Sequence, residues 1–159
     1  MAREPDSPDR LIAQNRRASH DYFILDTVEA GLVLAGTEVK SLRHGKASLA
    51  EAYATVENGE AWVLQLHIPP YEQGNRWNLE PTRRRKLLLH RTEITKLEKA
   101  VSQKGQTIIP LKLYFSRGYA KLLLGVGKGK KTHDKRQTIA ERDARREIQR
   151  AHRAGERGG

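Results

Sequence analysis

The sequence predicts a mainly β protein in which about six strands close into an antiparallel barrel flanked by helices. Short runs rich in β-branched, aromatic and aliphatic residues recur along the chain between turn signals. Two of the turns have the composition of tight hairpins, and no βαβ spacing indicates a parallel sheet. Among small closed antiparallel barrels, the OB-like barrel is the commonest that binds RNA, so an OB-like barrel is the expected fold.

The first predicted elements lie between residues 22 and 43. Residues 22–25 and 27–34 are two apolar runs, and each is expected to form a strand. Residues 36–43 are expected to form a helix, because Val39 and Leu42 are three positions apart and share one helical face.

A hairpin and a second helix follow. Residues 52–56 and 60–66 flank an Asn-Gly pair, which is the strongest short-range signal for a hairpin. Residues 92–100 have apolar residues at helical spacing, and Thr92 is the expected N-terminal cap.

The last predicted hairpin joins residues 107–115 to residues 119–126 around a Ser-Arg-Gly turn. Pro110 lacks the amide proton that a ladder hydrogen bond needs. Its strand is therefore expected to lie at an edge of the sheet or to contain a bulge.

The net charge is unevenly distributed. The chain of 159 residues has a formal net charge of +11, and residues 128–159 contain 11 Lys and Arg against 5 Asp and Glu. Ile139 and Ile148 are the only strong hydrophobes of this segment, so it cannot bury enough apolar surface to fold alone. We therefore expect a flexible leader at 1–10, an RNA-binding barrel at 11–127, and a basic tail at 128–159 that is disordered or becomes helical on binding.

The composition excludes several classes of protein. The chain has no cysteine, so disulfide frameworks, thiol nucleophiles and cysteine-ligated metal sites are excluded. No apolar run approaches the ~18 residues of a spanning helix, and the first ten residues lack an apolar signal-peptide core, so we expect a cytoplasmic protein. The excess of Lys and Arg favours a polyanionic partner. Nucleic acid is favoured over a membrane surface, because no segment combines this charge with a wide apolar face.

The sequence contains only weak candidates for a catalytic or nucleotide-binding motif. The segment 125–131 is rich in Gly and Lys but is no phosphate-binding P-loop, because its Gly-Lys pair is followed by Lys rather than Ser or Thr. The carboxylates of Glu29 and Glu38 are interpreted as acceptors for RNA amino groups, as partners that position an Arg, or as surface charges. His20 and Asp21, together with Glu38, leave a metal-dependent ribonuclease open as an alternative.

Several blocks of residues resemble one family, and the most specific reads Gly-Thr-Glu-Val-Lys-Ser-Leu-Arg at 36–43. The other matching blocks lie at 15–18, 20–22, 29–31, 45–47, 71–76, 85–89, 110–114, 129–131 and 133–136. Over roughly residues 12–150, the chain resembles the bacterial tmRNA-binding family called small protein B or SsrA-binding protein.

The resemblance implies an OB-like barrel that binds the tRNA-like domain of tmRNA. It implies that the complex enters ribosomes stalled on non-stop messages and rescues them by trans-translation, which tags the nascent chain for degradation. The implied partners are tmRNA (SsrA RNA), the stalled 70S ribosome with its small-subunit rRNA and, through charged tmRNA, elongation factor Tu and alanyl-tRNA synthetase. It implies no catalytic residue, no cofactor and no metal, and nothing in the sequence demands more than a monomer.

The resemblance also assigns two groups of site residues. Those associated with the tmRNA face are Asn15, Arg16, His20, Glu29, Glu38, Lys40, Leu88 and Lys121. Those expected in the decoding centre and the vacant mRNA channel are Lys128, Lys131, His133, Asp134, Lys135, Arg136 and Ile139. Taken without the family, the residues also leave open a general ribosomal or single-strand-binding barrel with no preference for tmRNA.

Overall fold

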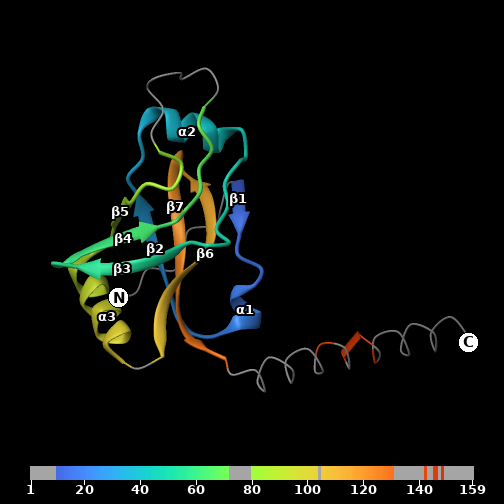
Figure 1. Ribbon diagram of the computed structural model, residues 1–159, viewed down its shortest axis with the longest axis vertical. Helices are drawn as coiled ribbons and strands as arrows, with labels where there is room; N and C mark the ends of the chain where they lie inside the picture. Colours follow the sequence, from blue (N-terminus) through green and yellow to red (C-terminus); the bar gives the residue numbers. More distant parts are fainter. Residues whose placement is uncertain are drawn as a thin grey trace, which may run out of the picture. The chain divides into compact units, whose positions relative to one another are not determined.

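The computed structural model describes residues 10–71, 80–103 and 105–130, together with residues 142, 145, 146 and 148. The chain divides into two compact units, Met1–Gly129 and Lys130–Gly159. The first unit holds the barrel (Figure 1). In the second unit, the four separately described residues are helical. Residues 1–9 of the predicted leader and residues 131–141 of the predicted tail lie outside the described residues.

The described strands form one antiparallel sheet that closes into a barrel, which confirms the predicted fold class. The strands are β1 (Arg10–Gln14), β2 (Tyr22–Leu32), β3 (Tyr53–Glu57), β4 (Glu60–Leu64), β5 (Arg85–Leu88), β6 (Gln106–Ser116) and β7 (Tyr119–Gly129). Their order is β1-β6-β3-β4-β5-β2-β7, and β7 also pairs with β6, which closes the ring. Closure is uneven: β3 and β6 share a single residue pair, Ala54 with Ile108, and β2 and β5 share two.

Three parts of the sheet differ from the prediction. No strand is predicted at residues 85–88, where the structure has β5. Residues 22–25 and the start of 27–34 belong to one strand, β2, and not to two, because both parts pair with β7. A register shift between Ile24 and Asp26 interrupts the alternation of side chains, so the continuity of the strand is hidden in the sequence. The strand β1 is absent from the prediction, since it is short and its partner β6 lies far along the chain.

Both predicted hairpin turns are confirmed. Asn58 and Gly59, between β3 and β4, have φ angles of 52° and 74°. Arg117 and Gly118, between β6 and β7, have φ angles of 53° and 82°. Positive φ at both central residues is typical of the type I′ turn, whose twist matches that of the paired strands.

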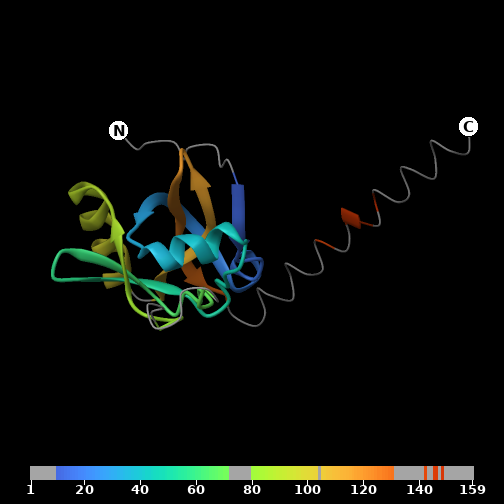
Figure 2. The same ribbon diagram turned by 90° about the horizontal axis from the view of Figure 1, so that it is seen from above.

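Three helices surround the described barrel: α1 (Ala18–Asp21), α2 (Gly36–Arg43) and α3 (Arg91–Ser102). The helix α2 has the predicted bounds and lies across one end of the barrel (Figures 1 and 2). The helix α3 packs against β6 and β3. In the part of the chain that the structure describes, no helix has the length and apolar content needed to cross a bilayer.

The start of α3 differs from the prediction. Its N-cap residue is His90 and not Thr92, and the His90 amide donates a hydrogen bond to the Glu93 carboxylate at 3.0 Å. A carboxylate in the first turn satisfies an amide that would otherwise lack a partner and interacts favourably with the helix dipole. Glu38 makes the same contact at the start of α2, where it accepts from the Ala35 amide at 3.0 Å.

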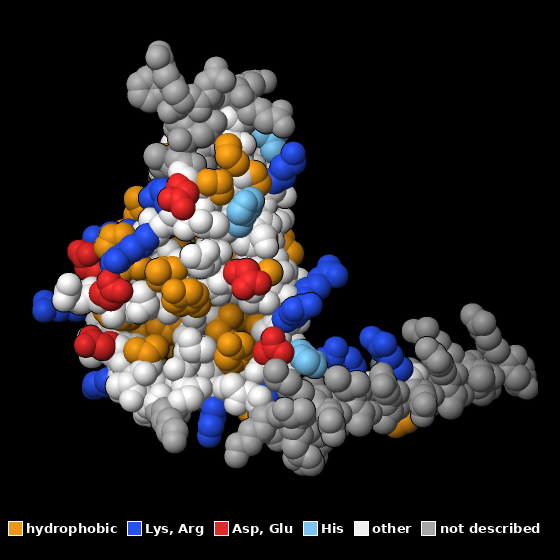
Figure 3. All heavy atoms as spheres, in the orientation of Figure 1, with side chains coloured by type: hydrophobic (Ala, Val, Ile, Leu, Met, Phe, Trp, Pro, Cys, Tyr) orange, Lys and Arg blue, Asp and Glu red, His pale blue; other side chains and the backbone are white. Residues whose placement is uncertain are grey.

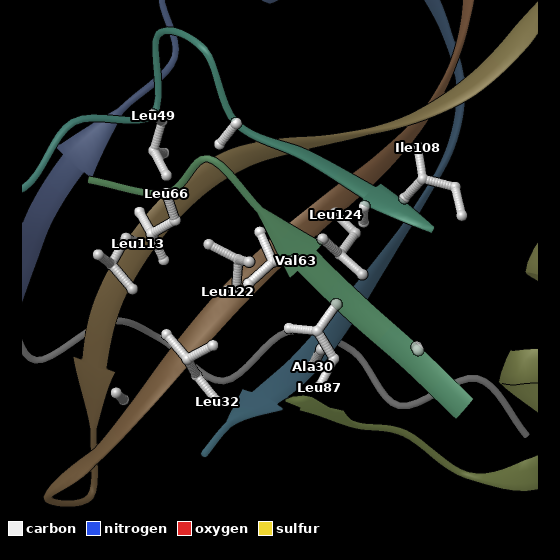
Figure 4. Close-up of a cluster of buried hydrophobic side chains, with 14 of the residues drawn as sticks. Ala30, Leu32, Leu49, Val63, Leu66, Leu87, Ile108, Leu113, Leu122 and Leu124 are labelled. Atoms are coloured by element: carbon white, nitrogen blue, oxygen red, sulfur yellow. The ribbon is translucent and has the colours of Figure 1, made fainter. Parts of the chain in front are cut away.

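The barrel is filled by aliphatic side chains, most of them from the inward-facing positions of the strands. In Figure 4 they point toward one another between the strands that enclose them. The largest fully buried members of this cluster are Leu42, Val63, Leu66, Leu87, Ile108, Leu113, Leu122 and Leu124. Because successive residues of a strand face opposite sides, the neighbours of these residues form the outer surface of the barrel.

The predicted irregularity at Pro110 is confirmed as a bulge. The pairing of β6 with β7 shifts register between Pro110 and Lys112, which leaves Leu111 as the extra residue. The side chain of Leu111 lies against Gly125 of β7, where an added Cβ would be 2.9 Å from the Leu111 Cδ1 atom. Glycine at position 125 therefore gives the bulge the room that it needs.

Candidate nucleic-acid interface

A surface pocket of about 230 Å³ lies where β7, β2 and β5 run side by side. Gly31 of β2 is paired with Lys121 on one side and with Leu88 on the other, so these three positions form a row on one face of the sheet. The pocket is lined by Glu29, Gly31, Leu88, Leu89, His90, Glu93 and Lys121. It therefore brings together three of the predicted tmRNA residues, which are widely separated in the sequence: Glu29, Leu88 and Lys121.

Gly31 allows β5 to approach β2 closely at this pocket. A Cβ on Gly31 would lie 3.2 Å from the Cβ of Leu88. The Leu88 side chain is 57% exposed, although its neighbour Leu87 is buried in the core. The pocket thus combines the carboxylates of Glu29 and Glu93, the ammonium group of Lys121 and the exposed side chain of Leu88. These groups can contact a donor, a phosphate and an apolar surface of a nucleic acid.

Glu29 is held by a buried tyrosine. Tyr114 of β6 is 2% exposed, and its hydroxyl donates a hydrogen bond to the Glu29 Oε2 atom. This bond joins β6 to β2, which are separated by β7. Glu29 is therefore fixed at the edge of the pocket by a residue on another strand.

Glu38 is not a surface charge but the centre of a buried ion-pair cluster. It is 5% exposed, and Arg85, which is fully buried, donates from Nε to the Glu38 Oε2 atom at 2.5 Å. Arg83 forms an ion pair with the Glu38 Oε1 atom and also donates from Nε to Oε2 at 3.2 Å. The remaining contacts of Arg85 are to the main-chain oxygens of Leu66, Pro81 and Arg83. The cluster ties α2 to β5, and the Glu38 carboxylate faces Arg83 and Arg85 and not the solvent.

The cluster also sets the ionisation of its members. Burial alone would raise the pKa of Glu38, but hydrogen bonds from Arg83, the Ala35 amide and Arg85 outweigh it and lower that pKa. Burial lowers the pKa of Arg85, and Glu38 opposes this shift. Both groups are therefore charged at neutral pH, and their charges are paired.

Lys40, an exposed residue of α2, lies beside the ring of Tyr71. Its Nζ atom is 5.8 Å from the centroid of the Tyr71 ring. Tyr71 is stacked on His44, with 5.7 Å between ring centroids and an interplanar angle of 16°. A cation beside stacked rings can contact both a phosphate and a base.

The third group of predicted residues lies at β1 and α1. The Asn15 side chain donates to the Pro110 carbonyl at 3.3 Å, and the Asn15 amide donates to the Leu111 carbonyl at 2.8 Å. Arg16 is exposed, and the Nδ1 atom of His20 is 2.9 Å from the Asp21 carboxylate. Asn15 thus anchors the segment on β6, and this anchoring places Arg16 and His20 at the surface.

The structure does not gather all the predicted tmRNA residues into one site. α1 precedes the start of β2, whereas the pocket lies near its end at Gly31. At ~3.3 Å per residue, the two ends of β2 are about 30 Å apart. On the face shown in Figure 3, apolar side chains occupy much of the centre of the barrel and Lys and Arg side chains lie mainly around its rim, whereas acidic side chains lie both near the centre and along the rim.

The ribonuclease alternative gains no support from the described geometry. Among the residues that the structure describes, no three His, Cys, Asp or Glu side chains are grouped so that they could hold a metal ion. Glu38, which that alternative requires, is engaged by Arg83 and Arg85. His20 and Asp21 are instead hydrogen bonded to each other.

Of the predicted ribosome-contacting residues, the structure places one. Lys128 belongs to β7, where it pairs with Phe23 of β2 and Gln106 of β6. The ladder of β7 thus continues to Gly129, two residues beyond the predicted end of the barrel at 127. The other predicted residues lie outside the described residues: Lys131, His133, Asp134, Lys135, Arg136 and Ile139.

Comparison with known proteins identifies the family of this barrel. The model of the SmpB protein family matches residues 12–154. The chain belongs to the SmpB family. The match spans the pocket, the buried cluster around Glu38 and the segment from Asn15 to His20.

Relatives of this SmpB chain are named SsrA-binding protein. The protein of Acetivibrio thermocellus is 60% identical over 141 residues, which cover 89% of this chain and 92% of the relative. That of Anoxybacillus flavithermus is 57% identical over 149 residues, which cover 94% of this chain and 97% of the relative. A solved structure described as "tmRNA-SmpB: a journey to the center of the bacterial ribosome" is 55% identical, with a TM-score of 0.65, over 76% of this chain and 85% of that chain.

Some residues that support or form the candidate interface are not predicted from the sequence. Arg85 stands in a run of four basic residues, a pattern typical of a solvated loop, yet it is fully buried. The signal that reveals it is its position two residues before the buried Leu87 in a strand, which places both on the inward face. His44 and Tyr71 carry no comparable signal, because their stacking depends on tertiary contact between distant segments.

Proposed function

We propose that this chain binds the tRNA-like domain of tmRNA and delivers it to ribosomes stalled on non-stop messages. Binding tmRNA is what its relatives are named for, and the similar solved structure is described as tmRNA–SmpB in the bacterial ribosome. In this role the chain is an RNA-binding factor and carries out no chemical step itself.

One observation carries the proposal at the level of residues. Glu29, Leu88 and Lys121 come from three strands and line the same pocket. An acceptor, an apolar group and a cation at fixed spacing recognise shape as well as charge, because only a correctly folded RNA presents a donor, an apolar surface and a phosphate together. Lys40 on α2 and the exposed Arg16 and His20 extend the proposed interface.

The role of the tail follows from the same proposal. The residues proposed to reach the decoding centre and the vacant mRNA channel are Lys128, Lys131, His133, Asp134, Lys135, Arg136 and Ile139. A basic segment with few apolar residues suits a channel walled by RNA. Elongation factor Tu and alanyl-tRNA synthetase are proposed as further partners, through the charged tmRNA, and the cytoplasm as the location.

The proposal is tested by competition binding at about physiological salt. The tRNA-like domain of tmRNA competes with an ordinary tRNA of similar length for the full chain. A preference of ~100-fold or more exceeds what phosphate contacts alone provide and supports recognition of the tRNA-like shape. Equal affinities that fall together as salt rises would instead identify a general RNA-binding barrel.

A salt titration separates the contribution of Lys121 from that of Leu88. Replacing Lys121 by Ala should lower the slope of log affinity against log salt by about 0.7 to 0.9, because one phosphate contact is lost. Replacing Leu88 by Ala should weaken binding without changing that slope, because no charge is removed.

A further inference from the structure

The hydrogen bond between Tyr114 and Glu29 is unusual in its position. Tyr114 is paired with Lys121 across the β6–β7 ladder, and Lys121 is paired with Gly31 across the β7–β2 ladder. Cross-strand partners point to the same face of a sheet, as do residues two apart in one strand. Tyr114, Lys121, Gly31 and Glu29 therefore share one face of the barrel.

That face is the outer one. The residues that alternate with this row fill the interior of the barrel, namely Leu113, Leu122 and Ala30. Tyr114 is 2% exposed but is not a member of the interior cluster. A nearly inaccessible ring on the outside of a barrel is thus held in place without contributing to the main core.

From this arrangement we infer that Tyr114 is a positioning residue for RNA binding: its hydroxyl holds the Glu29 carboxylate in the orientation that accepts a hydrogen bond from the RNA. The inference rests on the proposed function, because Glu29 lines the pocket with Leu88 and Lys121. The Glu29 carboxylate has two oxygens and only acceptor capacity, so it suits an N–H of a base or a ribose 2′-hydroxyl.

The physical basis is preorganisation. A free Glu side chain samples several rotamers, and binding must select one of them. Tyr has only two side-chain torsions, and burial fixes both, so its hydroxyl is a rigid donor. Ordering one flexible side chain in advance corresponds to about a threefold to tenfold gain in affinity.

The role is distinct from support of the fold. Glu29 is only half-buried, so water can replace the hydroxyl when it is removed, and the ring itself remains in Tyr114→Phe. The variant should therefore unfold at nearly the wild-type temperature. Its effect should appear in RNA binding and should depend on the presence of Glu29.

The test is a double-mutant cycle on the full chain, with the tRNA-like domain of tmRNA as the probe and an ordinary tRNA as the competitor. The variants are Tyr114→Phe, Glu29→Ala and the double variant. The expected result is that Tyr114→Phe weakens binding about threefold to tenfold in the wild-type background and has no further effect when Glu29 is already Ala. The matched control is Tyr119→Phe, on the same hairpin but 71% exposed, which should leave affinity unchanged.

Two further readouts separate the inference from a structural effect. The slope of log affinity against log salt should be the same in Tyr114→Phe as in wild type, because no phosphate contact is lost. Without RNA, the Tyr114 hydroxyl proton should exchange slowly with water by NMR in wild type and rapidly in Glu29→Ala.

The contrary outcomes distinguish failure of the positioning role of Tyr114 from failure of the proposed function. Wild-type affinity in Tyr114→Phe, or an equal loss in the presence and absence of Glu29, overturns the positioning role while leaving the proposed function intact. If the wild-type chain does not prefer the tRNA-like domain over tRNA, the proposed function fails, and the role of Tyr114 in binding that RNA fails with it.

Discussion

At the scale of single residues, burial decides what a charged side chain does. Glu38 and Arg85 are 47 residues apart in the sequence, but in the fold they form a buried ion pair between α2 and β5. Removing a charge from water is costly, and this cost is offset only when the charge is paired and hydrogen bonded. In the described residues every buried side-chain nitrogen and oxygen has a hydrogen-bond partner, so this cluster is fully satisfied.

The pH dependence of stability should reveal this cluster. The pKa of Glu38 is lower in the folded chain than its ordinary value of 4.5, so the folded state favours the ionised form. Its contribution to stability is therefore present above pH 4.5 and is lost as pH falls through the folded-state pKa. Glu38→Gln should lower the free energy of unfolding at pH 7 by about 3 kcal/mol, because Arg85 loses its charged partner.

The measurement is denaturant unfolding of both proteins from pH 7 down to the acid range. The difference between wild type and Glu38→Gln should narrow below pH 4.5, since the variant has no carboxyl at this position to protonate. The control is Glu57→Gln, which removes an exposed partner of Arg84 and should change stability by less than about 1 kcal/mol. A constant difference across all pH values would show that Glu38 does not titrate differently in the two states.

At the scale of elements, the contact between β6 and β7 depends on a missing side chain. The bulge at Leu111 places an aliphatic side chain where a Cβ on Gly125 would lie. Gly125→Ala should therefore destabilise the chain by about 1 to 3 kcal/mol through overpacking. In Gly125→Ala/Leu111→Ala the loss should be smaller than the sum of the two single losses, because the clash is removed.

The matched control for this prediction is Gly129→Ala in the same strand. No atom lies within 4 Å of an added Cβ at Gly129, so its substitution should be nearly neutral. Free energies of unfolding from denaturant titration provide the comparison. Equal effects at positions 125 and 129 would contradict the overpacking explanation.

The elements that the sequence predicts are those defined by local signals. The hairpin at Asn58-Gly59 and the helix α2 follow from turn chemistry and from spacing within a few residues. The strand β1 and the continuity of β2 do not, because the first depends on pairing with β6 and the second contains a register shift. Neither the pairing of β1 with β6 nor the register shift in β2 can be predicted from neighbouring residues in the sequence.

The candidate site divides in the same way. Family resemblance selects Glu29, Leu88 and Lys121, and the fold brings them together in one pocket. It does not select Tyr114 as the partner of Glu29, because that contact crosses an intervening strand. Residues that support others across strands can be found only when the register is known.

At the scale of the whole molecule, the barrel and the tail are expected to have separable roles. Residues Met1–Gly129 form a compact unit that contains the pocket, and β7 ends at Gly129. A chain truncated after Gly129 should bind the tRNA-like domain within about tenfold of the full chain at physiological salt, because only non-specific charge is lost. It should fail to support tagging on stalled ribosomes.

The truncated chain is examined by circular dichroism before the binding and tagging assays, so that loss of fold is recognised. Truncation after Gly129 is preferable to removal of residues 128–159, since Lys128 pairs with both neighbouring strands. Loss of tmRNA binding by a folded truncated chain would contradict the division of roles. Normal tagging activity would contradict the role of the tail.

The uneven closure of the barrel has a consequence for its motion. Three strands, β3, β4 and β5, form one half of the barrel, and β1, β6, β7 and β2 form the other. Among the described residues, the strand pairs between the two halves are the pair at Ala54 and the two pairs at Gly31 and Leu32, and the Val33 amide also donates to the Lys86 carbonyl at 3.1 Å. Seams with few ladder hydrogen bonds open at lower free energy than the strands on either side.

The pocket lies across one of these seams, with Leu88 on one half-barrel and Glu29 and Lys121 on the other. A molecule bound there contacts both halves at once and resists their separation. Amide protons of β2 and β5 should consequently exchange more slowly when the pocket is occupied, although no new backbone hydrogen bond is formed between the strands. Binding at the pocket should thus reduce the opening of the seam between β2 and β5 and make the barrel more rigid.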